Sequence, residues 1–294
     1  MREIVVISGK GGTGKTTLTA TLAYMLGASV TVADCDVDAA DMHLLLQPQS
    51  TREERFYSGD EPEIDASLCT GCGCCEEVCR FDAIHVVNGV AVLNPFLCEG
   101  CGYCARVCPV EAIAMRPCYV GLLFESQLST EATMIHARLT PGGENSGKLV
   151  ARVKKDARAA AERDGCDIVL VDGSPGIGCP VISSLSGADY VALVTEPTQS
   201  ALHDLGRVVE LLERFHLRAG CVLNKSDIHP AVAMRVREFL ADKDIPLLAE
   251  IPYDERVLEA IRLGKTPVEH APQAFQPLFK NILDTLLNES KEDK

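Results

Sequence analysis

A glycine-rich loop between an apolar run and a helical stretch constrains the fold of this chain more than any other feature. The apolar run at residues 4–7 leads directly into residues 9–16 (GKGGTGKT), and a helix is expected over residues 16–26. Glycines let such a loop close around phosphate groups, so that backbone N–H groups and the helix N-terminus face the anion. The strand–loop–helix order therefore predicts a phosphate-binding loop in an α/β fold.

Two residue types in this loop have distinct expected roles. Lys15 is expected to reach the β- and γ-phosphates of a nucleoside triphosphate, and the hydroxyl of Thr16 to ligate Mg²⁺. The remaining contacts that we predict for this loop are Gly11, Gly12, Thr13, Gly14 and Thr17.

Short apolar runs alternate with amphipathic stretches outside residues 60–116. This alternation predicts a parallel sheet covered by helices on both faces. Residues 47–65 carry two prolines, a glycine and many charges, and are expected to form a loop; the chain returns to the α/β fold near Pro117. The expected strands span residues 4–7, 30–33, 168–171, 190–194, 221–223 and 247–251, and the expected helices span residues 16–26, 149–164, 200–215, 231–241, 255–262 and 274–287.

The composition restricts the class of protein. The formal charge of −14 argues against non-specific binding to nucleic acid or to an anionic membrane. The N-terminus lacks the pattern of a secretory signal, and no run approaches the ~18 apolar residues of a membrane span. A cytoplasmic protein is therefore expected, in which fourteen cysteines indicate metal binding rather than disulfides.

Most of the cysteines lie in an internal repeat, in which residues 68–84 match residues 97–113. Each copy has the spacing CxxCxxCxxxC of bacterial ferredoxins, in which the fourth cysteine ligates the other cluster. A zinc ribbon would need two CxxC pairs instead, and Cys74 is interpreted as a non-ligand. We expect two [4Fe–4S] clusters, the first held by Cys69, Cys72, Cys75 and Cys108 and the second by Cys98, Cys101, Cys104 and Cys79.

The phosphate loop carries a second lysine, Lys10, and this signature resembles the MinD/ParA family of P-loop ATPases. The resemblance implies that Lys10 reaches across a nucleotide-sandwich dimer to the phosphates of the partner, in the manner of an arginine finger. Asp34 and Asp36 resemble the first switch, where Asp34 supports Mg²⁺ and Asp36 orients the attacking water; Asp38 is an alternative to Asp36. Asp172 resembles the Walker B aspartate, which holds Mg²⁺ through water, and begins a segment similar to the second switch.

Residues 224–227 (NKSD) lie at the end of a later expected strand, where the family reads the base. By the resemblance Asn224 bonds the purine edge, with Lys225 beside it. The same four residues fit the guanine motif of GTPases, in which Asp227 would bind guanine. The rest of the resemblance favours ATP, and Pro252 belongs to a loop similar to the one that flanks adenine.

The resemblance implies a P-loop ATPase domain formed by residues 1–59 and 117–294, with an α+β bacterial-type ferredoxin domain inserted over residues 60–116. The expected function is a dimeric ATPase switch that couples nucleotide state to electron transfer or redox sensing. A metallocluster assembly or carrier ATPase and a MinD-like spatial organiser with a redox sensor are the alternatives.

Expected partners are a second copy on ATP binding, or a related ATPase in a heterodimer, and an unidentified redox or metallocluster protein. Nucleic acid is not expected. The apolar stripe of the last helix is expected to dock on the sheet rather than on a membrane, because the tail at residues 288–294 is not basic.

Overall fold

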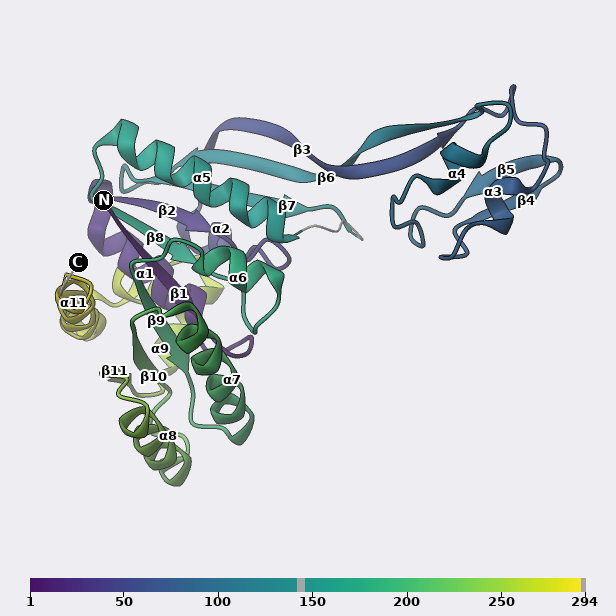
Figure 1. The fold of residues 1–294 in the computed structure, drawn as a ribbon. Helices are drawn as coiled ribbons and strands as arrows, with labels where there is room; N and C mark the ends of the chain where they lie inside the picture. The colour runs from purple at the N-terminus through teal and green to yellow at the C-terminus, as the bar shows by residue number, and fades with distance from the viewer. Residues whose placement is uncertain (142–145, 292–294) are drawn as a thin grey trace. The chain divides into compact units, whose positions relative to one another are not determined.

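The computed structural model describes residues 1–141 and 146–291, and the chain forms two compact units (Figure 1). The first unit comprises Met1–Glu54, Leu123–Arg138 and Ser146–Lys294, and the second comprises Arg55–Leu122 and Leu139–Asn145. Residues 142–145 of the expected ATPase domain, and residues 292–294 of the charged tail, lie outside the described residues.

Every strand and helix expected from the sequence is present. The strands are β1 (Arg2–Ile7), β2 (Val30–Asp34), β3 (Gln49–Ile64), β4 (Ile84–Val87), β5 (Val90–Leu93), β6 (Ile113–Gln127), β7 (Thr133–Leu139), β8 (Ile168–Asp172), β9 (Tyr190–Thr195), β10 (Ala219–Asn224) and β11 (Leu247–Ile251). The helices are α1 (Lys15–Leu26), α2 (Met42–Leu46), α3 (Cys74–Glu77), α4 (Tyr103–Val107), α5 (Ser146–Asp164), α6 (Cys179–Leu185), α7 (Gln199–Phe215), α8 (Pro230–Asp242), α9 (Glu255–Arg262), α10 (Pro267–His270) and α11 (Pro272–Glu289), with a 3₁₀ turn at Gly27–Ser29.

Within the described residues, the main sheet has nine strands in the order β11-β10-β9-β1-β8-β2-β7-β6-β3. The seven strands from β11 to β7 pair in parallel. All residues of β2, β8 and β9 are buried, as expected for parallel strands covered on both faces. The predicted α/β fold with a mostly parallel sheet is therefore confirmed.

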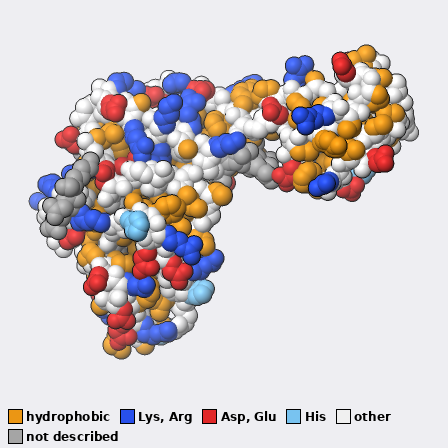
Figure 2. All heavy atoms as spheres, in the orientation of Figure 1, with side chains coloured by type: hydrophobic (Ala, Val, Ile, Leu, Met, Phe, Trp, Pro, Cys, Tyr) orange, Lys and Arg blue, Asp and Glu red, His pale blue; other side chains and the backbone are white. Residues whose placement is uncertain are grey.

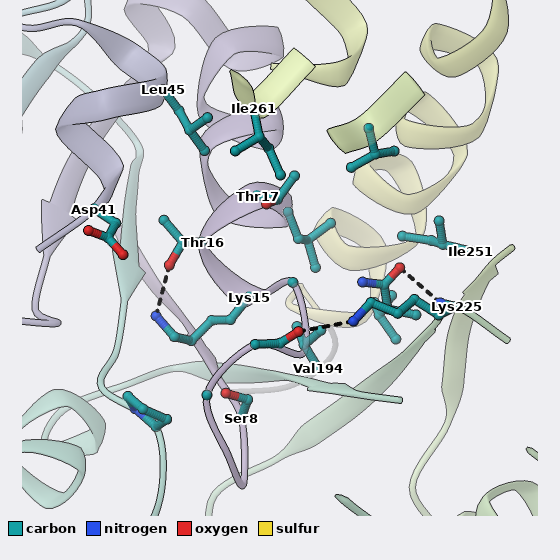
Figure 3. Close-up of a pocket in the computed structure, with 18 of the residues that line it drawn as sticks. Ser8, Lys15, Thr16, Thr17, Asp41, Leu45, Val194, Lys225, Ile251 and Ile261 are labelled. Atoms are coloured by element: carbon teal, nitrogen blue, oxygen red, sulfur yellow. Dashed lines mark hydrogen bonds between the residues drawn. The ribbon is translucent and has the colours of Figure 1, made fainter. Parts of the chain in front are cut away.

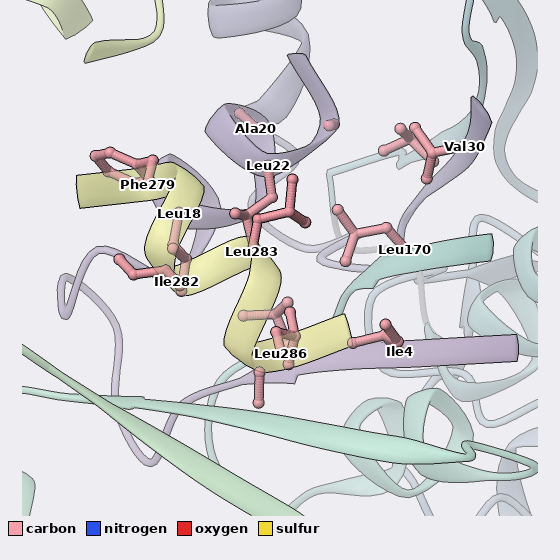
Figure 4. Close-up of a cluster of buried hydrophobic side chains, with 14 of the residues drawn as sticks. Ile4, Leu18, Ala20, Leu22, Val30, Leu170, Phe279, Ile282, Leu283 and Leu286 are labelled. Atoms are coloured by element: carbon pink, nitrogen blue, oxygen red, sulfur yellow. The ribbon is translucent and has the colours of Figure 1, made fainter. Parts of the chain in front are cut away.

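Helices cover the two faces of this sheet. On one face α5, α6 and α7 contact β2, β8, β1 and β9. On the other face α1 and α11 pack over strand residues such as Ile4, Val30 and Leu170 (Figure 4). Figure 2 shows acidic and basic side chains interspersed over the visible surface of the first unit.

The last helix docks on the core, as its apolar stripe predicted. Phe275, Phe279, Ile282 and Leu286 of α11 are buried in the same cluster as Leu18 of α1. Among the described helices, none combines the length and the apolar content that crossing a membrane requires.

The loop expected over residues 47–65 is wrong: most of this segment forms β3, a strand of 16 residues. β3 lies at the edge of the sheet beside β6 and is largely exposed on both faces, so it lacks the alternation of apolar residues that identifies a half-buried strand. Ring contacts between Tyr57 and Tyr119, and between Arg55 and Tyr119, add to its backbone pairing. β6 and β7 were also not expected.

The second unit repeats one local structure twice. α3 follows Gly73 and α4 follows Gly102, and both glycines have positive φ, at 80° and 73°. An antiparallel hairpin, β4–β5, adds to a small core of Cys75, Ile84, Ala91, Cys104 and Ile113.

Candidate nucleotide site and cysteine cavities

A cavity of about 500 Å³ lies in the first unit, at the carboxyl ends of its parallel strands (Figure 3). Ligands of open α/β sheets bind at this edge, because the loops that follow the strands converge there. The predicted site residues that line the cavity are Gly11, Gly12, Gly14, Lys15, Thr16, Thr17, Asp36, Asn224 and Lys225. The remaining predicted residues, which are Lys10, Thr13, Asp34, Asp38, Asp172, Asp227 and Pro252, are not part of its lining.

The phosphate loop requires glycine at its last turn. Gly14 has φ 97°, a conformation that L side chains rarely adopt, and a Cβ there would lie 2.2 Å from Nδ2 of Asn224. The same Nδ2 donates a hydrogen bond of 2.7 Å to the carbonyl oxygen of Thr13. Asn224 therefore joins the end of β10 to the phosphate loop.

Asp172 is the centre of a buried polar cluster below the loop. Its Oδ2 lies 2.9 Å from Nζ of Lys15 and accepts a 2.7 Å hydrogen bond from the Thr16 hydroxyl. Its Oδ1 accepts a 2.8 Å bond from the hydroxyl of Thr19, a residue that the sequence reasoning missed. The side chains expected at phosphate and at Mg²⁺ are thus in direct contact.

Lys15 also lies 3.3 Å from Oδ2 of Asp36. Burial acts to lower the pKa of Lys15, but the carboxylates of Asp172 and Asp36 outweigh it, and the net shift is upward. Burial raises the pKa of Asp36, against the opposing effect of Lys15. Lys15 therefore stays protonated among carboxylates, as a phosphate-binding lysine must.

Asp34 has an unsatisfied oxygen in this cluster. Oδ1 accepts a hydrogen bond from the backbone N–H of Asp36, whereas Oδ2 is buried without a hydrogen-bond partner. Burial and the neighbouring charge of Asp172 raise the pKa of Asp34 well above its usual range. A buried, unpaired carboxylate oxygen beside Asp172 fits a divalent cation, which prefers oxygen ligands.

The two candidate water-positioning residues differ in location. Asp36 is buried, lines the cavity and contacts Lys15. Asp38 is exposed and lies outside the cavity lining. The geometry favours Asp36 for this role.

Lys10 is held by its own chain. Its Nζ lies 2.8 Å from Oε1 of Glu196 and within 3.2 Å of the hydroxyl oxygens of Thr198 and Ser200. Glu196 was not predicted from the sequence, where its only signal is its position directly after β9 at the carboxyl edge of the sheet.

The residues expected to read the base lie at two places. Lys225 donates a 3.1 Å hydrogen bond to the carbonyl oxygen of Gly12 and pairs with Glu196 at 2.8 Å. Asp227 accepts the backbone N–H of Tyr253 at 2.7 Å and so fixes the loop that contains Pro252. Beyond Asn224 the cavity wall is apolar, formed by Val194, Val222, Ile251, Val257, Leu258, Ile261 and Phe279.

Two further cavities in the second unit are lined by cysteines. The first contains Cys69, Cys72, Cys75 and Cys108, with Cys74 beside them; the second contains Cys79, Cys98, Cys101 and Cys104. The four cysteines of each predicted set thus lie around one cavity, and the last cysteine of each run lies with the other run. Backbone N–H groups donate to the Sγ atoms of Cys69, Cys79, Cys98 and Cys108 at 3.3–3.4 Å.

In the described residues, these thiols do not form a site for a single metal ion. Within residues 1–141 and 146–291, no group of three or more His, Cys, Asp or Glu side chains is gathered around a point where one metal ion could sit. A four-iron cluster needs its thiolates further apart, because each binds a different iron. The donor set of four thiols with backbone N–H groups on the sulfurs fits such a cluster.

Residues 4–268 match the family model of the CobQ/CobB/MinD/ParA nucleotide binding domain. The chain belongs to this family. The matched residues include the phosphate loop, Asp34 and Asp36, Asp172 and the β10 motif. The family is one of nucleotide binding domains, so the cavity that these residues surround is a nucleotide site.

The chain is similar to proteins whose names indicate different functions. An uncharacterized protein of Methanocaldococcus jannaschii, MJ0578, is 33% identical, over 77% of this chain and 79% of its own length. The iron-sulfur cluster carrier protein of Pyrococcus abyssi is 24% identical, over 99% of this chain and 88% of its own length. The septum site-determining protein MinD of Pyrococcus horikoshii, solved as a complex with Mg-ADP, has a TM-score of 0.57 and 22% identity, covering 99% of each chain. The structural likeness shows the shared fold.

Proposed function

We propose that this protein is an ATP-binding and ATP-hydrolysing switch whose second unit carries two [4Fe–4S] clusters, and that it couples nucleotide state to electron transfer or redox sensing. One observation carries the proposal: the same chain has a family phosphate site and two cavities with four cysteines each. The corresponding domains are an ATPase domain (residues 1–59 and 117–294) and a ferredoxin domain inserted at residues 60–116.

At the nucleotide site, Lys15 binds the β- and γ-phosphates, and its contact with Asp36 is exchanged for the contact with phosphate. Thr16, Asp34 and Asp172 would hold Mg²⁺, which would neutralise phosphate charge. Asp36, once released from Lys15, orients the water that attacks the γ-phosphate to give ADP and phosphate. The family membership and the Mg-ADP complex of the Pyrococcus horikoshii relative support this assignment.

At the cysteine cavities, the residues that hold the clusters are those lining each cavity, with Cys108 and Cys79 exchanged between the two runs. The clusters would supply one-electron chemistry, and the backbone N–H groups on the sulfurs stabilise added negative charge. Cys74 is a non-ligand in this assignment.

ATP binding joins two copies of the chain, or one copy and a related ATPase, because Lys10 completes the phosphate site of the opposite subunit. The support for this step is the membership of the family that includes MinD and ParA. Hydrolysis removes the γ-phosphate and releases the dimer.

The test combines iron analysis with EPR spectra of the reduced protein, reconstituted without oxygen, with and without Mg-ATP. We expect about eight irons per chain and a spectrum that changes with Mg-ATP. Cys108→Ala and Cys69→Ala should lose one and the same cluster, whereas Cys79→Ala and Cys98→Ala lose the other. Loss of the same cluster in Cys79→Ala and Cys69→Ala would contradict the ligand assignment, and a protein without iron would contradict the function.

A second candidate, a carrier that passes a cluster to another protein, is favoured by the name of the Pyrococcus abyssi relative. Its test is the transfer of labelled iron to an apo-ferredoxin. ATP-dependent loss of iron from this protein supports a carrier. Full retention of iron during many cycles of hydrolysis supports the redox switch.

A further inference from the structure

Glu196 joins two lysines that belong to separate motifs of the nucleotide site. One oxygen, Oε1, pairs with Lys10 of the phosphate loop at 2.8 Å, and the other, Oε2, pairs with Lys225 of the β10 motif at 2.8 Å. The side chain of Glu196 is only 10% exposed, whereas the side chains of Lys10 and Lys225 are 28% and 31% exposed. Burial acts to raise the pKa of Glu196, but the hydrogen bonds from both lysines outweigh it, and the pKa is lowered.

Each N–H group of the Lys10 ammonium has an acceptor available in this arrangement. An ammonium group has three N–H donors, and Lys10 has three acceptors within 3.2 Å, on Glu196, Thr198 and Ser200. Thr198 is also the N-cap of α7, so two of the acceptors belong to the start of that helix. A phosphate can bind Lys10 only after some of these contacts break.

We propose that Glu196 is a positioning residue that holds Lys10 inward on its own chain in the nucleotide-free protein, and that Lys10 becomes available to a triphosphate only when this ion pair opens. The inference rests on the proposed function for the role of Lys10 toward ATP. Glu196 also pairs with Lys225, and Lys225 in turn donates a hydrogen bond to the carbonyl oxygen of Gly12 in the phosphate loop. Glu196 therefore links the base-reading motif to the lysine that serves the phosphates.

Glu196→Gln separates this role from a purely structural one. Glutamine has the same shape, but it carries no charge, and the amide nitrogen at one of its two terminal positions is a donor that cannot accept from a lysine. Reductive methylation of lysines in the nucleotide-free protein, followed by mass spectrometry, measures whether Lys10 is held. We expect the rate at Lys10 to rise about fivefold in the variant, the effect of losing an ion pair worth about 1 kcal/mol. The exposed Lys280 serves as the internal reference.

Asp204→Asn is the matched control, because it removes a negative charge from α7 beside Gly9, where its backbone approaches the loop. This variant should leave the methylation of Lys10 unchanged. Equal rates at Lys10 in wild type and Glu196→Gln would overturn the proposal. A similar rise in both variants would do so too, because it would reflect general charge rather than the contact.

A second readout uses the Mg-AMPPNP concentration that gives half-maximal self-association in light scattering. Glu196→Gln should lower this concentration about fivefold, and the effect should vanish when Lys10→Ala is present as well. An effect that persists without Lys10 would overturn the positioning role. A wild-type protein that binds no Mg-AMPPNP would overturn the proposed function, while the methylation experiment would still decide whether Glu196 holds Lys10.

Discussion

Asp34 is a residue at which stability and function conflict. Its carboxylate is buried beside Asp172 with one oxygen unpaired, and its pKa is raised well above the usual range by burial first and by Asp172 second. A raised pKa in the folded state means that stability is fully present below the unfolded value of about 3.9 and is lost as the pH rises through the folded pKa. The carboxylate therefore lowers the stability of the protein at neutral pH, and the proposed Mg²⁺ ligation would account for its presence.

We predict that Asp34→Asn stabilises the protein at neutral pH. Asparagine keeps the oxygen that accepts the N–H of Asp36 but removes the buried charge. The gain in the free energy of unfolding should be near zero at pH 4 and reach about 1–3 kcal/mol at pH 7, measured by urea denaturation. Mg²⁺-dependent nucleotide binding should be weaker in the same variant. Asp38→Asn, at an exposed position, is the control, and a gain that does not grow with pH would contradict the argument.

Asp227 distinguishes the two interpretations of the NKSD motif. In the structure its carboxylate accepts the N–H of Tyr253 and is not part of the cavity lining. Asp227→Ala should therefore loosen the loop around Pro252 and weaken ATP and GTP binding by a similar factor, about tenfold for one charge-assisted hydrogen bond. Titration with fluorescent ATP and GTP analogues measures the ratio. A loss confined to GTP would show that Asp227 reads guanine.

The location of a site residue was predictable where one motif contains all of its partners. The glycines, Lys15 and Thr16 follow from the local loop, whose geometry is fixed by neighbouring residues. The ion pairs of Glu196 join three segments far apart in the chain, and no local pattern indicates them. The structure was therefore needed to find the residue that holds Lys10.

At the scale of elements, burial of the apolar stripe of α11 contributes to the free energy of unfolding. Ile282 is fully buried in the core cluster with Leu18 of α1 (Figure 4). Ile282→Ala should lower the free energy of unfolding by about 2–5 kcal/mol, measured by chemical denaturation. Lys280→Ala, on the exposed side of the same helix, should change it by less than about 0.5 kcal/mol. Equal, small effects of the two substitutions would mean that α11 does not dock on the sheet in solution.

The elements of the parallel sheet were predictable because their apolar residues are concentrated in short buried runs. β3 was not, since a strand exposed on both faces gains its stability from backbone pairing and cross-strand rings rather than from an apolar face. Its single proline, Pro62, and its charges are tolerated at the edge of a sheet, where an unpaired backbone N–H faces solvent. The composition that indicated a loop is equally compatible with an edge strand.

For the whole molecule, the order of strands connects the two proposed activities. Asp34 at the end of β2 is in register with His136 of β7, and β7, β6 and β3 follow each other in the sheet. β3 and β6 each contain residues of both units. The proposed first switch, at the end of β2, thus lies on a strand that neighbours β7 in the sheet, and β7 neighbours β6, whose residues divide between the two units.

This connection gives a prediction that thermodynamic linkage makes quantitative. If nucleotide binding and cluster reduction are coupled, the same coupling free energy appears in both measurements. A tenfold tighter binding of Mg-ATP to the reduced protein requires a reduction potential about 59 mV higher with Mg-ATP bound, for a one-electron step. Calorimetric titrations of the oxidised and reduced protein give the first quantity, and redox titrations monitored by EPR give the second.

The control for this linkage is the cluster-free protein, prepared with all eight cluster cysteines replaced by alanine. Its nucleotide affinity should not respond to dithionite, because the clusters are the groups through which reduction is proposed to change nucleotide binding. Identical Mg-ATP affinity in the oxidised, reduced and cluster-free proteins would mean that the clusters and the nucleotide act independently, and the coupled switch would have to be abandoned. A potential shift without a matching affinity shift would instead show that one of the two titrations is not at equilibrium, since reciprocity holds for any true coupling.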